Sequence, residues 1–221
     1  MRLHGREEVT LELGGTIPLD AARRLLAGTT LAPETAGDTD ARVHLLAFQM
    51  RGLRPRGLPA ALGSDYREAL WRLGVVWEGR PAWLAVACDL DRALVRTLGS
   101  WLVRYPVVAA RIAFASPHGV QVDAHGLSFR ASAAPEPGSE PPPAPPRRTL
   151  VRQAGALFEI PWEEEPAPWR REAHVTIESD ARARAAFGLQ PGEALAWGPR
   201  GLVQAGRGHR CGLARRVAPG P

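Results

Sequence analysis

The sequence predicts a mainly β protein, built as an antiparallel β-barrel with two or three helices. Short segments alternate apolar and polar residues, which is typical of strands with one buried face. Turn-forming glycines and prolines separate these segments, and only two or three stretches show helical spacing instead. Many short strands joined by turns favour a closed barrel, because closure leaves no strand edge unpaired.

The N-terminal part begins with a strand and a short helix. Residues 8–13 alternate apolar and polar side chains and end at two glycines. Residues 18–27 form the predicted helix, with a proline at its start and a glycine directly after it. A second strand is expected over residues 43–50. Residues 52–63 hold three glycines and two prolines, so we expect a loop there.

A long hairpin is predicted over residues 66–90. Apolar side chains repeat with period two along its first strand, at Trp71, Leu73, Val75 and Trp77. Residues 78–81 supply the turn. The returning strand, residues 82–88, is apolar on both faces, so it should be covered on both sides.

Residues 91–103 fit a helix that Asp91 can cap. Its apolar side chains fall on one stripe, formed by Leu94, Leu98, Trp101 and Leu102. Three consecutive strands follow, with turns between them at residues 116–119 and 125–126. These strands are expected over residues 107–115, 120–123 and 127–133.

The remainder contains an insertion, further strands and a tail. Residues 134–146 include seven prolines in thirteen positions and are expected to form an exposed, semi-rigid insertion. Apolar patterning resumes over residues 150–160, and two last strands are expected over 173–178 and 194–203. We therefore predict one domain over residues 1–205, followed by a disordered basic tail over residues 206–221.

The composition is that of an ordinary globular protein. The chain has 221 residues, of which 45% are hydrophobic and 23% charged, enough for one sizeable core. No apolar run is long enough to span a membrane, and the first nine residues lack a signal-peptide core. We expect a cytoplasmic location. Cys88 and Cys211 are far apart in the sequence, and buried free thiols are expected rather than a disulfide or a metal site.

The chain contains 28 arginines and no lysine. Asparagine is also absent, which is typical of a very GC-rich coding sequence. The net charge of +5 raises the question of nucleic acid. The arginines are scattered, however, and neither zinc-finger spacing nor an aromatic RNA-binding signature is present, so no nucleic-acid partner is expected. An arginine-rich solvated surface explains the charge.

The middle of the sequence carries four motifs in a fixed order. Tyr66-Arg67-Glu68-Ala69 starts a strand, Asp89-Leu90-Asp91 forms a turn before a helix, and Gly99 and Tyr105-Pro106 follow. This series resembles the acetoacetate decarboxylase family. The sequence departs from the family at Ser100-Trp101, which replaces an Arg-Glu pair, and at Val107-Val108, where the family has two lysines. The resemblance spans roughly residues 8–204, is specific only over 66–112, and implies a barrel or cone with a central cavity.

The resemblance also shows which chemistry is missing. In the family, the first lysine forms a Schiff base with a ketone, and the second lowers the pKa of the first. Val107 and Val108 can do neither, and arginine cannot replace an amine nucleophile because its guanidinium stays protonated. We therefore expect no Schiff-base decarboxylation, as in the uncharacterised relatives that lack the lysine pair.

Four further positions complete the expected site. Glu68 matches a cavity glutamate of the family and is the candidate acid or base. Val107, Val108 and Tyr105 are expected to line the pocket. If one regular strand begins at Val107, Arg111 shares its inward face and can hold a carboxylate. The alternatives are a solvent-facing Glu68, an Arg111 that extends into solvent, or an ion pair between the two.

Other motifs are weaker. His118, Asp123 and His125 lie in or beside predicted turns and are better explained as solvated residues than as metal ligands. No nucleophile elbow is present, residues 198–201 are a turn rather than a phosphate loop, and residues 163–165 form an exposed acidic loop. We expect no metal and no cofactor.

Three functions remain open. The first is non-covalent binding of a small organic acid or carbonyl compound. The second is acid–base catalysis on a keto or hydroxy acid, with Glu68 carrying the proton. The third is a scaffold or interaction protein with a filled interior. A homo-oligomer is compatible with all three.

Overall fold

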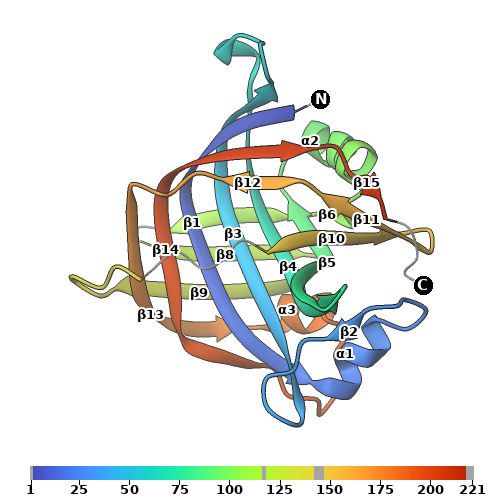
Figure 1. Cartoon of the computed structure of the whole chain (residues 1–221). Coiled ribbons are helices and arrows are strands. Elements are labelled where there is room, and N and C mark those ends of the chain that lie inside the picture. Colours follow the sequence, from blue (N-terminus) through green and yellow to red (C-terminus); the bar gives the residue numbers. More distant parts are fainter. Residues whose placement is uncertain (1, 116–117, 142–146, 218–221) are drawn as a thin grey trace.

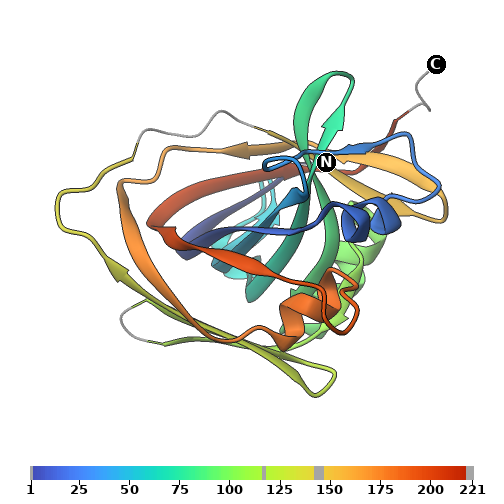
Figure 2. The same cartoon turned by 90° about the horizontal axis from the view of Figure 1, so that it is seen from below.

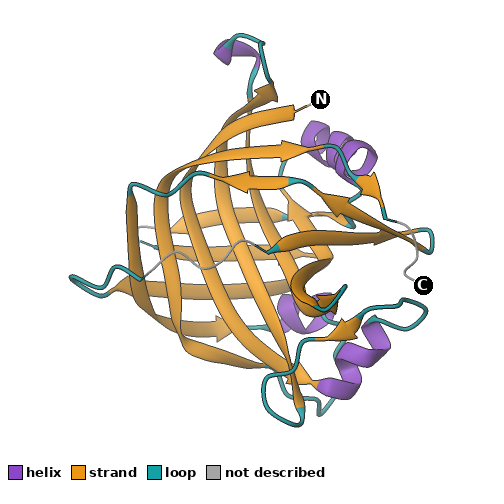
Figure 3. Ribbon diagram, viewed as in Figure 1, coloured by secondary structure: helices purple, strands orange, loops and turns teal. Residues whose placement is uncertain are grey.

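The computed structural model describes residues 2–115, 118–141 and 147–217. Strands dominate these residues, as Figure 3 shows. The strands are β1 Arg2–Pro18, β2 Ala32–Pro33, β3 Asp40–Pro55, β4 Ser64–Trp77, β5 Arg80–Leu90, β6 Val107–Ala109, β7 Arg111–Ala115, β8 Gly119–Ala124, β9 Leu127–Pro135, β10 Arg148–Gln153, β11 Ala156–Ile160, β12 Trp162–Glu164, β13 Trp169–Ser179, β14 Ala196–Gly212 and β15 Arg215–Arg216. The helices are α1 Leu19–Leu25, α2 Ala93–Leu98 and α3 Ala181–Ala186, with a 3-10 turn, η1 Ala60–Leu62, and a π-helical turn, η2 Gly99–Val103.

All described strands belong to one sheet, whose middle is a wall of five long strands. The order within this central wall is β5-β4-β3-β1-β14 (Figure 1). Its pairings are all antiparallel, and parallel pairing occurs where β10 and β6 each join β5. In Figure 2 the wall crosses the molecule, with β13, β9 and β8 curving round one side and β10 to β12 lying on the other.

The central wall is buried on both faces, because alternate side chains of each strand enter different cores. The first core is enclosed by the wall together with β13, β9, β8 and β7, and helices α1 and α3 pack against it. Trp71 lies in this core, where its ring meets Phe129 and Phe187 edge-on. Its indole nitrogen and Arg182 of α3 both donate to the buried carboxylate of Asp89, at 2.7 to 2.9 Å.

The second core lies on the other face of the wall. It contains Leu46, Phe48, Leu70 and Cys88 from the wall, and it is covered by β10 to β12 and by α2 with η2. Most of the buried polar side chains of the described residues lie on this side of the wall, among them His209, whose ring centre is 6.1 Å from that of Phe48.

Hydrogen bonding does not close the sheet into a barrel, which differs from the closed barrel that we predicted. Instead, the described strands return to the wall at two breaks, where one strand ends and the next pairs with a different neighbour. At Ala110 the chain passes from β6, which pairs with β5, to β7, which pairs with β8. At Pro161 it passes from β11, which pairs with β10, to β12, which pairs with β14. Proline has no N–H to continue a ladder, which accounts for the second break.

The predicted α2 stripe is wrong except at Leu102, which packs against the second core. Leu94 and Trp101 are 64% and 69% exposed, and it is Val95 and Val103 that enter the second core. The helix begins at Ala93 without a side-chain cap. Asp91 instead accepts a hydrogen bond from the backbone N–H of Arg67 at 2.9 Å. Val95, Gly99 and Leu102 also recur at helical spacing, so the helix packs on the face beside the predicted stripe.

The predicted disordered tail is also wrong over its first twelve residues. β14 continues to Gly212 between β1 and β12, and Arg207 and His209 are buried there. Ion pairs with buried acids stabilise this arginine-rich segment in the sheet. Its glycines alone suggest disorder, so the sequence does not reveal this order. Residues 218–221 lie outside the described residues. So do residues 142–146 of the predicted proline-rich insertion, whose first two residues end β9.

Other expectations are confirmed. The fold is mainly β with three α-helices in the described residues, and the hairpin of β4 and β5 has the predicted turn at Glu78 and Gly79. Cys88 and Cys211 are both free and buried. Among the described residues, no helix has both the length and the apolar character needed to cross a membrane.

Candidate functional site

Strand β4 positions the candidate site. Trp71 and its alternate neighbours enter the first core, so Tyr66, Glu68, Leu70 and Arg72 face the second. Glu68 lies opposite Phe48 of β3 and Leu90 of β5, deep within the wall. It is 4% exposed, so the alternative of a solvent-facing glutamate is excluded.

The carboxyl group of Glu68 has an apolar, weakly bonded environment. The thiol of Cys88 donates to its Oε1 at 3.4 Å, and this is the one hydrogen bond found for it among the described residues. Burial raises the pKa of Glu68 to about 7, against a smaller lowering by Cys88 and His209. The group is therefore poised to hold or release a proton near neutral pH.

Tyr105 and Val107 lie in the second core with Glu68. Burial raises the pKa of Tyr105 well above its ordinary value, and the negative charge of Glu68 adds to the effect. The phenol oxygen is buried without a hydrogen-bond partner among the described residues. Val107 pairs with Cys88 and packs against this core, while Val108 pairs with Asp89 and is half-buried.

Arg72 is a buried cation with no carboxylate within ion-pair distance in the described structure. It is 7% exposed, its Nε has no partner, and its Nη2 donates to Nδ1 of His44 at 2.8 Å. Burial and then the charge of Arg72 lower the pKa of His44 to about 4, so the ring is neutral. The guanidinium of Arg72 also lies 5.2 Å from the ring centre of Trp83.

The other buried charges on this face are paired. Arg207 donates to Glu7 at 2.6 Å and to Glu164 at 2.6 Å, and His209 contacts Glu7 at 2.8 Å. Burial alone would lower the pKa of His209, but its contacts with Cys211 and Glu7 together raise that pKa to about 10. This cluster joins β1 to β14 and leaves no spare charge for a ligand.

The expected inward position of Arg111 is wrong. Its side chain is exposed, and its neighbour Ile112 enters the first core instead. The break at Ala110 places Val107 and Arg111 in different strands. The predicted alternation of side chains along one strand from Val107 therefore does not reach Arg111. An ion pair between Glu68 and Arg111 is likewise absent from the described contacts.

Side chains able to bind a metal ion are spread out among the described residues. No three of their histidine, cysteine, aspartate and glutamate side chains gather closely enough to hold an ion. His118 stacks on Trp169 with ring centres 5.5 Å apart, and Asp123 accepts a hydrogen bond from Gln121 at 2.7 Å.

Arg72, His44 and Glu12 are the residues that sequence reasoning missed. A signal for Arg72 was present, since it follows Glu68 by four residues on one strand and therefore shares its face. The carboxylate of Glu12 lies 3.4 Å from Nε2 of His44. The proximity of β1 and β3 was not visible in the sequence, so neither could be placed.

The fold and site together define a class: a mainly β protein whose central wall separates an apolar core from a polar one. No protein-family model matches the sequence, and no curated protein matches it. Several solved structures match this chain in fold. The enduracididine biosynthesis enzyme MppR, complexed with pyruvate, has a TM-score of 0.70 at 17% identity, over 99% of this chain and 91% of MppR.

Two further structures agree. Acetoacetate decarboxylase from Legionella pneumophila has a TM-score of 0.72 at 9% identity, over 99% of this chain and 88% of that one. An acetoacetate decarboxylase-like enzyme from Sphingomonas wittichii RW1 has a TM-score of 0.63 at 19% identity, covering 98% and 92%. The chain has the acetoacetate decarboxylase-like fold, as the resemblance at residues 66–112 implied.

Proposed function

We propose that this chain is a cytoplasmic protein that binds a small carboxylate or keto acid in its second core, without forming a covalent bond to it. The observation that carries the proposal is Arg72, a buried guanidinium whose described contacts include no carboxylate. The carboxylates of Glu12 and Glu164 act on Arg72 from beyond ion-pair distance, so the buried cation has no direct carboxylate partner among the described residues. Such a cation is costly, and a carboxylate ligand with two oxygens matches its fork of donors.

Tyr105 supports the same site. Its buried hydroxyl lacks a partner, and a carbonyl or hydroxyl oxygen on the ligand would accept its hydrogen bond. The surface beside Arg72 and Tyr105 is formed by Glu68, Cys88 and Val107. It is uncharged when Glu68 is protonated. A small acid bearing one further oxygen is the ligand that these groups fit.

Covalent decarboxylation is outside the proposal. Neither valine carries an amine, and the sequence contains no lysine from which a Schiff base could form. The enzymes with this fold therefore suggest the kind of compound, a small keto acid such as the pyruvate bound to MppR, rather than the reaction.

A second candidate function is acid–base catalysis on the bound acid. The buried position of Glu68 and its pKa near 7 favour it, because a carboxylate of that basicity can take a proton from carbon beside a carbonyl. In this reaction the carbon–hydrogen bond breaks, its electrons move to the carbonyl oxygen, and Glu68 receives the proton.

The binding test is a thermal-shift and calorimetric screen of small keto, hydroxy and carboxylic acids, with pyruvamide as the uncharged counterpart of pyruvate. A ligand at about 100 times its dissociation constant adds roughly 2.7 kcal/mol to the folded state. Arg72→Met should weaken binding at least about tenfold, Tyr105→Phe less, and Arg111→Met, which removes an exposed arginine, not at all.

The catalytic candidate has its own readout. Exchange of pyruvate methyl protons for deuterium, followed by NMR, should be lost in Glu68→Gln while binding remains. Binding without exchange supports a binding protein alone. A flat response to every acid would contradict both proposals and favour a scaffold with a filled interior.

A further inference from the structure

Most of the exposed large apolar side chains lie on two segments of the chain. Seven such side chains are exposed among the described residues, and five belong either to the loop between β3 and β4 or to the helix formed by α2 and η2. The five are Leu58, Leu62, Leu94, Leu98 and Trp101. The other two, Val76 and Leu127, lie singly beside hairpin turns. Single exposed apolar residues are ordinary, but a cluster indicates an interaction surface.

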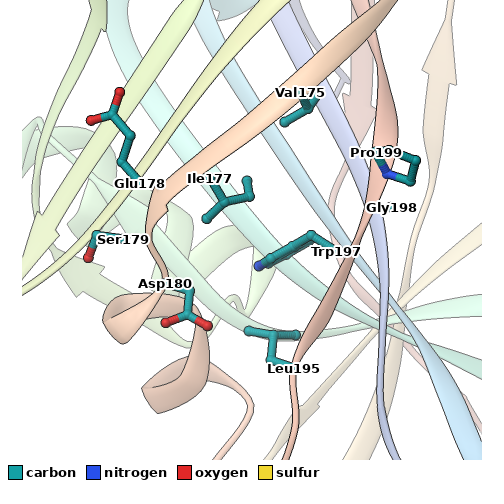
Figure 4. Close-up of a pocket in the computed structure, with 9 residues that line it drawn as sticks. All are labelled: Val175, Ile177, Glu178, Ser179, Asp180, Leu195, Trp197, Gly198 and Pro199. Atoms are coloured by element: carbon teal, nitrogen blue, oxygen red, sulfur yellow. The ribbon is translucent and has the colours of Figure 1, made fainter.

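Other apolar surface is covered more closely. Figure 4 shows the hollow where β13 and β14 separate, with Ile177, Leu195 and Trp197 between the two strands. These three side chains are half-buried and pack against the first core. The apolar side chains of the loop and the helix instead extend into solvent.

The loop, residues 51–63, is an ordered projection. Arg54 donates hydrogen bonds to the carbonyl oxygens of Gly52 and Leu58, at 2.9 and 3.1 Å. At the base of the loop, a Cβ on Gly63 would lie 2.6 Å from the Cα of Gly52, so these two glycines close it tightly. Figure 3 shows the helical turn of η1 at the tip of the projection, above the sheet. Leu58 and Leu62, 45% and 65% exposed, are therefore held in solvent by an ordered structure.

The helix, residues 92–104, carries the other three apolar side chains. Leu94, Leu98 and Trp101 recur at helical spacing and form one stripe along its solvent side. Val95 and Val103 attach the helix to the second core. The stripe is thus the apolar face of a helix that is already anchored elsewhere.

The loop and the helix emerge from the same end of the central wall. The loop leads into the start of β4 and the helix follows the end of β5, and these ends are adjacent because the two strands are antiparallel. Asp65 lies between them, where the N–H of Gly52, then Arg51 and then Arg92 lower its pKa. In Figure 1 both segments lie at the upper end of the molecule.

Both segments are basic. Each contains three arginines and no acid. Arg56 and Arg92 are exposed, and no acid of the described residues lies within ion-pair distance of either. Asp65 and Asp91 lie at the base of the segments, but each is already paired with another arginine, at 2.7 and 3.5 Å. Exposed apolar side chains are thus combined with a positive charge.

We propose that this end of the molecule, residues 51–63 and 92–104, binds the surface of an anionic lipid bilayer. The leucines and Trp101 enter the boundary between headgroups and acyl chains, and the arginines contact lipid phosphates. Binding of this kind needs no membrane-spanning helix.

Two observations favour a bilayer over a protein partner. The apolar side chains stand on two separate projections, to which a fluid bilayer adapts, whereas a folded partner would need a matching hollow for each. A second copy of the chain, placed face to face, would bring the arginines of both copies together, and like charges repel.

Flotation with lipid vesicles tests the proposal on the full chain. Vesicles of equal parts phosphatidylglycerol and phosphatidylcholine should bind it at least about tenfold more tightly than vesicles of phosphatidylcholine alone, and added salt should reduce the difference. Brominated lipids in the anionic vesicles should quench tryptophan emission. This quenching should be lost in Trp101→Phe, which removes the exposed indole.

Apolar variants localise the contact. Trp101→Ser and Leu62→Ser should each weaken binding to the anionic vesicles at least about fivefold. Leu127→Ser removes an exposed leucine outside the two segments and should leave binding unchanged. All three side chains are exposed, so thermal unfolding should match that of the native chain.

Charge variants complete the test. Arg56→Gln and Arg92→Gln should each weaken binding to the anionic vesicles about fivefold. Arg80→Gln, at the opposite end of β4, and Arg72→Met, in the second core, should leave it unchanged. Equal binding to neutral and anionic vesicles, or no binding to either, would overturn the proposal. A dimer in analytical ultracentrifugation that Trp101→Ser dissociates would assign this end to a second copy and overturn it too.

Discussion

Arg72 donates a hydrogen bond to Nδ1 of His44 at 2.8 Å, across the β3–β4 pair. Because arginine has no acceptor, Nδ1 must carry the lone pair, and the proton of the neutral ring is on Nε2, facing Glu12. A protonated ring would direct a second positive charge at the guanidinium. The contact therefore requires a neutral histidine in the folded protein.

This arrangement should weaken the protein in mild acid. The pKa of His44 is about 4 when folded and 6.5 ordinarily, so the unfolded chain binds the extra proton first. The stabilisation that comes from keeping His44 neutral is complete above about pH 6.5. It is lost as the pH falls toward 4, which lowers the free energy of unfolding by about 3 kcal/mol at most. Between pH 4 and pH 7, the change in unfolding free energy measured with urea should be about 3 kcal/mol less favourable for His44→Gln than for the native chain, since other groups act equally in both. The exposed His174→Gln should match the native chain.

Glu68 should change the stability in the opposite direction over nearly the same pH range. Its pKa is about 7 when folded and 4.5 ordinarily, so the folded state favours the neutral acid. Stability is unaffected below about pH 4.5 and falls as the pH rises to 7, by about 3 kcal/mol. Relative to the native chain, Glu68→Gln should gain stability across this range. If both unfolding curves change in parallel between pH 5 and pH 8, Glu68 does not have the raised pKa.

Arg182 should be among the most sensitive positions. Its guanidinium is the cation paired with Asp89, and the two side chains are 6% and 0% exposed. Arg182→Met leaves a buried carboxylate with the Trp71 indole as its remaining donor, which should cost about 3–5 kcal/mol in chemical denaturation. Arg23→Met removes an ion pair that is 63% and 80% exposed, and it should cost less than about 1 kcal/mol.

Two glycines in the pairing of β1 with β14 should respond differently to alanine. A Cβ at Gly201 would lie 2.7 Å from Leu13 and 2.8 Å from the carbonyl oxygen of Glu12, whereas one at Gly14 meets nothing within 4 Å. Gly201→Ala should destabilise by about 1–3 kcal/mol, and Gly14→Ala should be near neutral. Equal thermal stabilities of the two variants would refute the close packing of β14 on β1.

Borohydride treatment distinguishes covalent from non-covalent chemistry. Reduction in the presence of acetoacetate or pyruvate converts a Schiff base into a stable adduct that increases the protein mass. With no lysine in the chain, intact-mass spectrometry should find no adduct on any side chain. The α-amino group is the one remaining amine and is blocked by acetylation in the control. An adduct that survives this block would require another nucleophile.

The fold was predictable because its signals are local or distinctive. The hairpin of residues 66–90 shows period-two patterning with a turn, and residues 66–112 carry the motif that indicates the family fold. That motif also singled out Glu68 as a candidate, and the structure places it, buried, on the second-core face of β4. Arg111 was misplaced because the strand breaks at Ala110, and nothing in the local sequence marks this change of partner.

The polar second core was not predictable for a different reason. It is assembled from β1, β3, β4 and β14, whose pairings join residues about 200 positions apart, such as Glu7 and Arg207. Residues 206–212 therefore resemble a flexible tail when their composition is considered alone. Their order depends on ion pairs with partners at the other end of the chain.

The position of β1 between β3 and β14 also has a consequence for synthesis on the ribosome. β1 leaves the exit tunnel before the other described strands, yet one of its edges stays unpaired until β14 has been translated. Neither core can be completed earlier, since both use β14 as wall. Folding of both cores is therefore delayed until β14 has emerged, and until then the nascent chain exposes a long strand edge that is open to aggregation or to chaperone binding.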